Sequence, residues 1–172
     1  DPYLVCSTQH CQVYSGRDRE HDTTNKAVTD THGLMLFQKD DHLVDSVYSA
    51  SCGGHSEHNE NVWEGIAKEA LRGVRDAPRG KGYWKAGTVP DPETLERFID
   101  NPPWTYCGNT SKGNKVFRWE RLYPTEELDR LVNLKHAIGH VEAIEVLGRG
   151  VSGRVTHVRF SGDKGEIVVE GE

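Results

Sequence analysis

Apolar positions along this chain follow the two-residue period of strands in some segments and the helical period in others. Apolar residues at 34–37 and 43–44 flank the polar residues 38–41, and this pattern predicts a β-hairpin. Apolar residues recur again in the last third, where alternation predicts sheet. There we expect strands at 117–119, 141–147, 155–160 and 167–169.

Two helices are expected between these strands. Asp91 followed by Pro92 is typical of a helix start, with Asp as the N-cap and Pro in the first turn. Pro124 and Thr125 precede the second helix. The faces expected to be buried contain Leu95, Phe98 and Ile99 in the first helix, and Leu128, Leu131 and Val132 in the second. The sequence therefore predicts an α+β fold, mainly antiparallel sheet with two or three short helices and long Gly/Pro-rich loops.

Composition excludes several classes of partner. Of the 172 residues, 35% are hydrophobic and 28% are charged, and the formal net charge is −6. A negative chain does not favour a nucleic-acid backbone, so we expect no nucleic-acid partner. The charge also disfavours strongly anionic wall polymers but is compatible with neutral sugars. No apolar run approaches the roughly 18 residues that a membrane-spanning helix needs.

One polar cluster stands out as a candidate binding surface. A strand-like stretch at 43–48 breaks into Ser51-Cys52-Gly53-Gly54, and a run of polar residues follows at 55–61. The glycine pair permits backbone conformations that side chains forbid and lets another chain approach closely. We expect this surface to bind a hydroxyl-rich ligand along the glycines. The alternative is a Gly-rich turn followed by a solvated loop.

The same segment offers candidate catalytic groups. Glu57, Glu60 and Glu64 are the nearest carboxylates, but acids in a wet loop stay ionised, which favours binding over acid catalysis. Cys52 with His55 hints at thiol chemistry, but no orienting acid or amide is placed beside them. His55 with His58 completes no metal-ligand set. Cys52 could instead form a disulfide with Cys107 in an oxidising compartment.

A second cluster lies near the start of the chain. Cys6 and Cys11 enclose four residues, with His10 beside the second cysteine. This spacing suits either a metal clip or a small disulfide ring. Zinc usually takes four ligands, so a fourth would have to come from elsewhere or from water.

Four motifs in this order resemble the stage II sporulation protein D family (SpoIID/LytB), which are peptidoglycan lytic transglycosylases. The central motif is Tyr-Ser-Ala-Ser-Cys-Gly-Gly-His-Ser-Glu at 48–57, followed by Val-Trp at 62–63. The others are Cys-Ser-Thr-Gln-His-Cys-Gln-Val-Tyr-Ser-Gly at 6–16, Ala-Val-Thr-Asp-Thr-His-Gly-Leu-Met-Leu at 27–36 and Gly-Arg-Gly-Val-Ser-Gly-Arg-Val-Thr-His-Val at 148–158. The resemblance spans nearly the whole chain and is looser over 78–125.

The resemblance implies site residues and their roles. It implies a substrate cleft formed by Tyr48, Ser51, Cys52, Gly53, Gly54, His55, Ser56 and Glu57. It also favours a structural zinc on Cys6, His10 and Cys11. The family's catalytic glutamate lies upstream of the motif at 6–16, so no catalytic residue is assigned in this chain. We accordingly expect a domain truncated at its N-terminus, with a cleft-forming part at 1–77, a looser helical insert at 78–138 and a C-terminal sheet part at 139–172.

The function implied is the substrate-cleft portion of a murein lytic transglycosylase that acts on peptidoglycan glycan strands. The alternative is a non-catalytic wall-binding or assembly module with a structural zinc site. Either would be extracytoplasmic, secreted or membrane-anchored through a segment outside this chain, and could belong to a membrane-associated cell-wall complex.

Overall fold

The computed structural model describes residues 16–39, 41–47, 49–63, 65–78, 82–109 and 115–171. The chain forms two units, Asp1–Val44 and Asp45–Glu172, which are considered separately. Among the described residues, no helix is both long enough and apolar enough to pass through a bilayer.

The first unit holds one helix and the predicted hairpin. A short 3₁₀ turn, η1 (Arg17–Arg19), precedes α1 (Asp22–Asp30). The hairpin is present in minimal form, with Phe37 paired to Leu43 in a single antiparallel bridge. Many of the described side chains of this unit are exposed, Leu34 and Leu36 among them at 73% and 71%.

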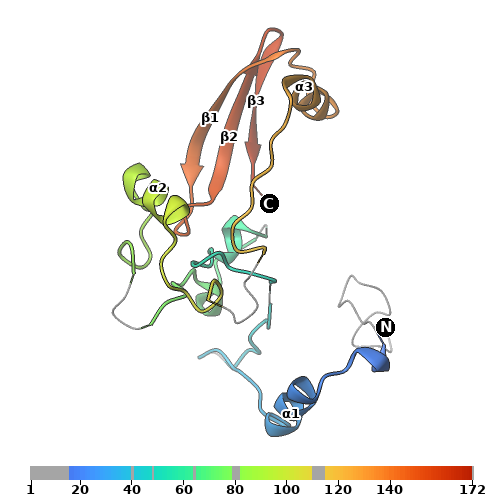
Figure 1. Ribbon diagram of the computed structural model, residues 1–172, viewed down its shortest axis with the longest axis vertical. Coiled ribbons are helices and arrows are strands. Elements are labelled where there is room, and N and C mark those ends of the chain that lie inside the picture. Colours follow the sequence, from blue (N-terminus) through green and yellow to red (C-terminus); the bar gives the residue numbers. More distant parts are fainter. Residues whose placement is uncertain are drawn as a thin grey trace. The chain divides into compact units, whose positions relative to one another are not determined.

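The second unit ends in a three-stranded antiparallel sheet with the order β1-β2-β3 (Figure 1). The strands are β1 (Val141–Arg149), β2 (Val155–Gly162) and β3 (Gly165–Glu170), which confirms the three strands expected in this region. The register between β1 and β2 shifts at several positions, as in a β-bulge. The nine residues of β1 therefore pair with the eight residues of β2.

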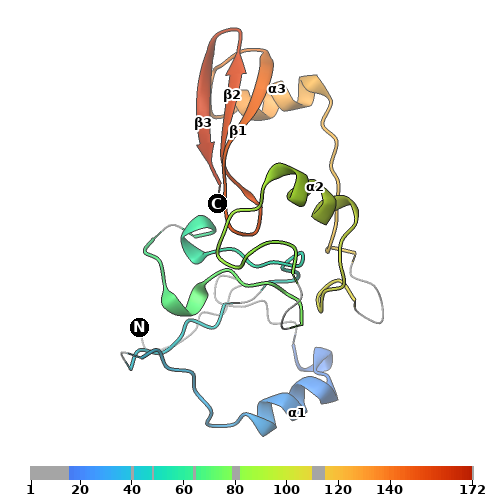
Figure 2. The ribbon, with the colours of Figure 1, turned by 90° about the vertical axis from the view of Figure 1, so that its left-hand side faces the viewer.

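Helix α3 (Thr125–Asn133) lies beside this sheet in both ribbon views (Figures 1 and 2). Polar side chains at its C-terminal half attach it to the start of β1. Asp129 accepts a hydrogen bond from the main-chain N of Val141 at 2.8 Å, and Asn133 bonds both the N and the O of Gly139 at 2.9 and 2.7 Å. The predicted apolar face is only partly covered, since Leu131 is 37% exposed.

Helix α2 (Pro92–Asp100) begins where the sequence predicts. The Asp91 carboxylate accepts from the Thr94 main-chain N at 2.9 Å, satisfying one of the unpaired donors of the first turn. Leu95 and Phe98 are buried, but Ile99 is 50% exposed. The buried face is therefore narrower than predicted.

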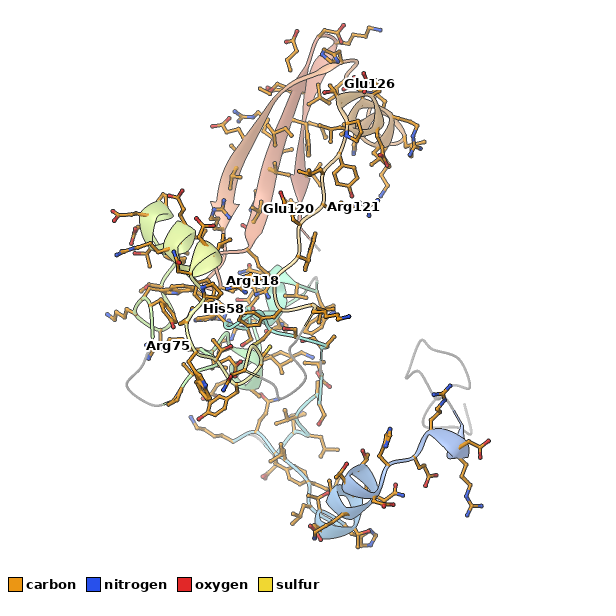
Figure 3. All side chains as sticks on the ribbon, viewed as in Figure 1. His58, Arg75, Arg118, Glu120, Arg121 and Glu126 are labelled. Atoms are coloured by element: carbon orange, nitrogen blue, oxygen red, sulfur yellow. The ribbon has the colours of Figure 1, made fainter. Side chains whose placement is uncertain are left out.

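The expected strand at 117–119 is absent from the structure, which has turns in this segment. Arg118 explains the difference, because its guanidinium lies over the rings of Phe98 and Phe117, at 4.8 and 4.3 Å from their centroids. It donates to the carbonyls of Gly53 and Phe98 at 2.8 and 3.0 Å. Figure 3 shows Arg118 near α2, whereas Glu120 and Arg121 lie on the segment leading to α3.

The apolar core of the second unit is small. Its buried hydrophobic residues are Leu95, Phe98, Ile138, Val141 and Val151. Phe98 packs against two aromatic side chains, with the Tyr83 and Trp84 rings 5.2 and 5.0 Å away. Short 3₁₀ turns, η2 (Asn59–Asn61) and η3 (Glu69–Leu71), complete the elements of an α+β fold, as predicted.

We predict that Phe98→Ala lowers the free energy of unfolding by about 3–5 kcal/mol, because it removes a buried ring and leaves a cavity. Denaturant titration of the purified chain measures this loss. Ile99→Ala is the matched control and should cost about 1 kcal/mol or less, since its side chain is half in solvent. Equal losses at the two positions would contradict the assignment of Phe98 to the core.

Candidate functional site: a polar pocket beside the glycine pair

A pocket of about 460 Å³ opens in the second unit. Its lining mixes hydroxyl, charged and apolar side chains. The polar and charged members are Ser49, Ser51, Ser56, Glu57, Asn59, Arg72 and Arg154, and the others include Val47, Cys52, Val62, Trp63 and Leu71. Trp63 is 48% exposed and so presents part of its ring to solvent. The volume suits one or two small polar ring systems.

The inner wall of the pocket is a short paired segment. His55 forms an antiparallel bridge with Arg75, and the Ser56 main-chain N donates to the Val74 carbonyl at 2.9 Å. The Ser56 hydroxyl accepts from the Val74 N at 2.9 Å. The same hydroxyl donates to the Val74 carbonyl at 3.3 Å, so the pairing fixes the serine where it lines the pocket.

The glycine pair has a packing role that differs from the one expected. Gly53 and Gly54 have φ values of 67° and 99°, in the left-handed region that favours glycine. A methyl group at Gly54 would lie 2.9 Å from the Phe98 ring, so the close approach is made by the protein's own core. Gly54 is buried, and neither glycine lines the pocket. The pocket lies beside the pair rather than over it.

Glu57 accepts hydrogen bonds from one distant segment of the chain and from residues next to it in the sequence. Ser152 donates to it from its hydroxyl at 2.5 Å and from its main-chain N at 3.0 Å, and the Val151 N donates at 3.2 Å. Locally, the His58 N and the Asn61 amide donate at 2.8 and 3.1 Å. Burial by itself raises the pKa of Glu57, but these donors outweigh burial and hold the pKa below its ordinary value. Glu57 is therefore ionised at neutral pH and is unsuited to be a general acid.

Gly150 makes the contact between these segments possible. A methyl group at this position would lie 2.2 Å from a Glu57 carboxylate oxygen. The carboxylate thus sits directly against the main chain at 150–152, in the turn between β1 and β2. The two sequence motifs at 48–57 and 148–158 meet here.

Arg154 completes the link between the two motifs. Its guanidinium donates to the carbonyls of His55 and Cys52 at 2.9 and 2.7 Å. These bonds tie the main chain on both sides of the glycine pair to a residue about 100 positions further along the chain. In the described part of the chain, main-chain oxygens rather than carboxylates bind this cation, so its positive charge remains available at the pocket wall.

A second arginine, Arg72, also belongs to the lining. Arg72 forms an ion pair with Glu60, with one nitrogen donating to the carboxylate at 2.7 Å, and it also bonds Asn59. The hydrogen bond and charge of Arg72 lower the pKa of Glu60 to about 2. Asn59 is buried and ties this pair to the main chain through bonds with Ile66 and Lys68, both at 2.9 Å.

His55 is a buried structural histidine in this arrangement. It is 2% exposed and stacks on Trp84, with ring centroids 5.2 Å apart. Its Nδ1 lies 2.7 Å from the Ser56 carbonyl, which can only accept, so this nitrogen carries the proton. Burial lowers the pKa of His55, so the ring is neutral at physiological pH. Because Nδ1 is bonded to a carbonyl and the ring packs on Trp84, His55 is placed for packing rather than for activating the Cys52 thiol.

Two thiols and a carboxylate meet behind the pocket. Ligand atoms of Cys52, Asp76 and Cys107 lie within 4.8 Å of one another. These residues are close enough to bind a metal ion, and Cys and Asp are both ligands that zinc accepts. Neither cysteine is in a disulfide.

The predicted site residues therefore divide into two groups in space. Ser51, Cys52, Ser56 and Glu57 line the pocket, and Gly53, Gly54 and His55 form the packed layer next to it. Tyr48 and the predicted zinc ligands Cys6, His10 and Cys11 lie outside the described residues. Sequence reasoning missed Asp76 and Arg72, which lie in no recognisable local pattern. It included Ser152 in the motif at 148–158 but did not identify Glu57, 95 residues away, as its partner.

Comparisons with known proteins divide the chain differently from the resemblance found in its sequence. A family model described as "Domain of unknown function (DUF8618)" matches residues 57–172, and one described as "Stage II sporulation protein" matches residues 1–37. An uncharacterized protein of Brachyspira hyodysenteriae is 34% identical over 73 residues, which are 42% of this chain and 19% of that protein. The chain thus spans about a fifth of the curated relative it matches. No solved structure matches it.

We predict that Glu57→Gln lowers the free energy of unfolding at pH 7 by about 2 kcal/mol, because hydrogen bonds to a charged acceptor are lost. The lowered pKa means that ionised Glu57 stabilises the fold above its ordinary value of 4.5 and that this stabilisation disappears as pH falls through the folded pKa. The difference between variant and parent should therefore shrink on going from pH 7 to pH 3 in denaturant titrations. Glu126→Gln, at an exposed position, should show no such difference at any pH. A Glu57→Gln loss that is independent of pH would count against an ionised Glu57.

Proposed function

This chain belongs to the family described as "Domain of unknown function (DUF8618)", and we propose that its pocket binds peptidoglycan glycan strands as part of a cell-wall protein. The match of residues 1–37 to a stage II sporulation protein model supports a role in cell-wall biology. The finer assignment, the substrate-cleft portion of a murein lytic transglycosylase, rests on the resemblance of the four motifs at 6–16, 27–36, 48–63 and 148–158.

The pocket itself carries the proposal. Sugars offer hydroxyl groups around an apolar ring face, and proteins bind them with hydrogen-bonding side chains beside an aromatic ring. Serines at 49, 51 and 56 line the pocket, although the hydroxyls of Ser51 and Ser56 also bond to Cys107 and Val74, and the half-exposed Trp63 supplies the ring. These groups surround a single open space large enough for sugar rings.

One cation of the lining refines the substrate class. Arg154 presents a guanidinium bound to main-chain carbonyls, whereas the charge of Arg72 at the same pocket is paired with Glu60. A glycan strand without stem peptides exposes the carboxylate of each muramic acid residue. Guanidinium groups bind carboxylates well, so this pocket favours peptide-free strands over strands that carry amide-linked peptides.

The state of Glu57 bears on whether this part of the protein performs chemistry. A transglycosylase needs a protonated carboxylic acid at the glycosidic oxygen, and an ionised, fully bonded Glu57 does not provide one. Glu57 therefore contributes to the structure of the pocket rather than to acid catalysis. The second candidate function, a non-catalytic wall-binding or assembly module, is favoured by the same observation.

We predict that Trp63→Ala weakens binding of purified, peptide-free glycan strands by about tenfold or more, which corresponds to about 1.4 kcal/mol for loss of one aromatic contact. Isothermal titration with strands of defined length measures the affinity. Trp119→Ala is the matched control, because this tryptophan is 79% exposed and does not line the pocket, and it should leave the affinity unchanged. Equal effects of the two changes, or no measurable binding by the parent chain, would refute the proposal.

The two candidate functions are separated by a second measurement. The full-length protein should release anhydro-sugar products from peptide-free strands if it is a transglycosylase. Binding without such products would establish the wall-binding alternative.

A further inference from the structure

Two cysteines and an aspartate from three separate segments converge beside the glycine pair. Their ligand atoms lie within 4.8 Å of one another, and all three residues are partly buried. Two sulfurs at about 2.3 Å from a tetrahedral metal are about 3.8 Å apart, so shifts of about 1 Å at most would bring this cluster to binding geometry. Rotation of the thiol side chains about χ1 covers such shifts.

The main chain holds each member of the cluster in place. The Asp76 N donates to the Gly54 carbonyl at 3.0 Å, and the Cys107 N donates to an Asp76 carboxylate oxygen at 2.6 Å. The Cys52 carbonyl is bound by Arg154 at 2.7 Å. The aspartate is thus oriented by one of the two cysteine residues that it would join in binding a metal.

The cluster brings two sulfur ligands and one carboxylate ligand together. Thiols bind a divalent metal ion as thiolates, and the ion compensates the negative charge that three such ligands gather at one point.

Arg118 supplies part of the compensation. Its guanidinium interacts electrostatically with both thiols, and it is fixed by its bond to the Gly53 carbonyl. With a divalent ion, two thiolates and a carboxylate, the site would carry a charge of about −1, which this arginine offsets.

We propose that Cys52, Cys107 and Asp76 bind one divalent metal ion of the zinc class. The fourth ligand position is available to water or to the Ser51 hydroxyl, which lies 2.8 Å from the Cys107 sulfur. Binding releases the thiol protons to solvent. The ion joins the segments at 52, 76 and 107, and so it stabilises the wall of the pocket. This proposal concerns a different part of the chain from Cys6, His10 and Cys11, and it does not depend on glycan binding.

The test uses the whole chain with Cys6→Ser and Cys11→Ser as the background, so that the first cysteine pair contributes no metal. Protein stripped with a chelator, kept reduced and reloaded with Zn²⁺ is passed over a desalting column, and its zinc is measured by mass spectrometry. We expect about one zinc per chain in the background. Adding Cys52→Ser or Asp76→Asn should weaken the affinity at least tenfold in competition with a chromophoric chelator, since even outer-shell changes cost about 10–100-fold.

Asp100→Asn is the matched control and should retain the background affinity, because Asp100 is exposed at the end of α2. If circular dichroism shows that the background chain is unfolded, the comparison is made in the chain with all four cysteines, with and without Asp76→Asn. Co²⁺ is then loaded in place of zinc. Loss of part of the cobalt–thiolate absorption is then expected. The proposal is overturned if the background chain retains no zinc, if Asp76→Asn or Cys52→Ser binds as tightly as the background, or if Cys52 and Cys107 are isolated as a metal-free disulfide.

Discussion

The carboxylate of Glu57 is the constraint on which the rest of the pocket depends. It accepts hydrogen bonds from Ser152 and Val151, about 95 residues away, and from its own neighbours. A half-buried charge of this kind is stable only because so many donors surround it. Arg154 reinforces the same junction by binding the main chain on the far side of the glycine pair. The pocket wall is therefore assembled by polar contacts more than by the small apolar core.

Local signals in the sequence predicted much of the fold. The cap at Asp91 and the alternation at 141–169 are short-range patterns, and both led to elements that the structure contains. The strand expected at 117–119 is wrong for a reason that no local pattern contains. Arg118 lies against two aromatic rings and donates to two main-chain carbonyls, and its partners are up to 65 positions away in the chain.

The sequence predicted where the candidate site lies in the chain, but not which contacts hold its residues in place. The residue types at 51–57 pointed to a polar surface, and four of these residues line the pocket. Glycine pairs indicate that something approaches the main chain closely, but the sequence does not say what. At Gly54 the approaching group is the ring of Phe98. Asp76 escaped notice because an isolated aspartate before an Ala-Pro pair carries no signal of the two thiols that fold against it.

The contact between Glu57 and the β1–β2 turn has a practical consequence for dissecting this protein. The segment that closes the pocket is the tip of a hairpin from the C-terminal sheet, although most of the lining comes from residues 47–74. A shorter chain that ends after α2 or α3 would keep nearly all of the lining residues. It would lose the hydrogen bonds from the β1–β2 turn that hold Glu57 in place. Making a smaller version of this pocket therefore requires keeping the hairpin through Arg154 and its return strand.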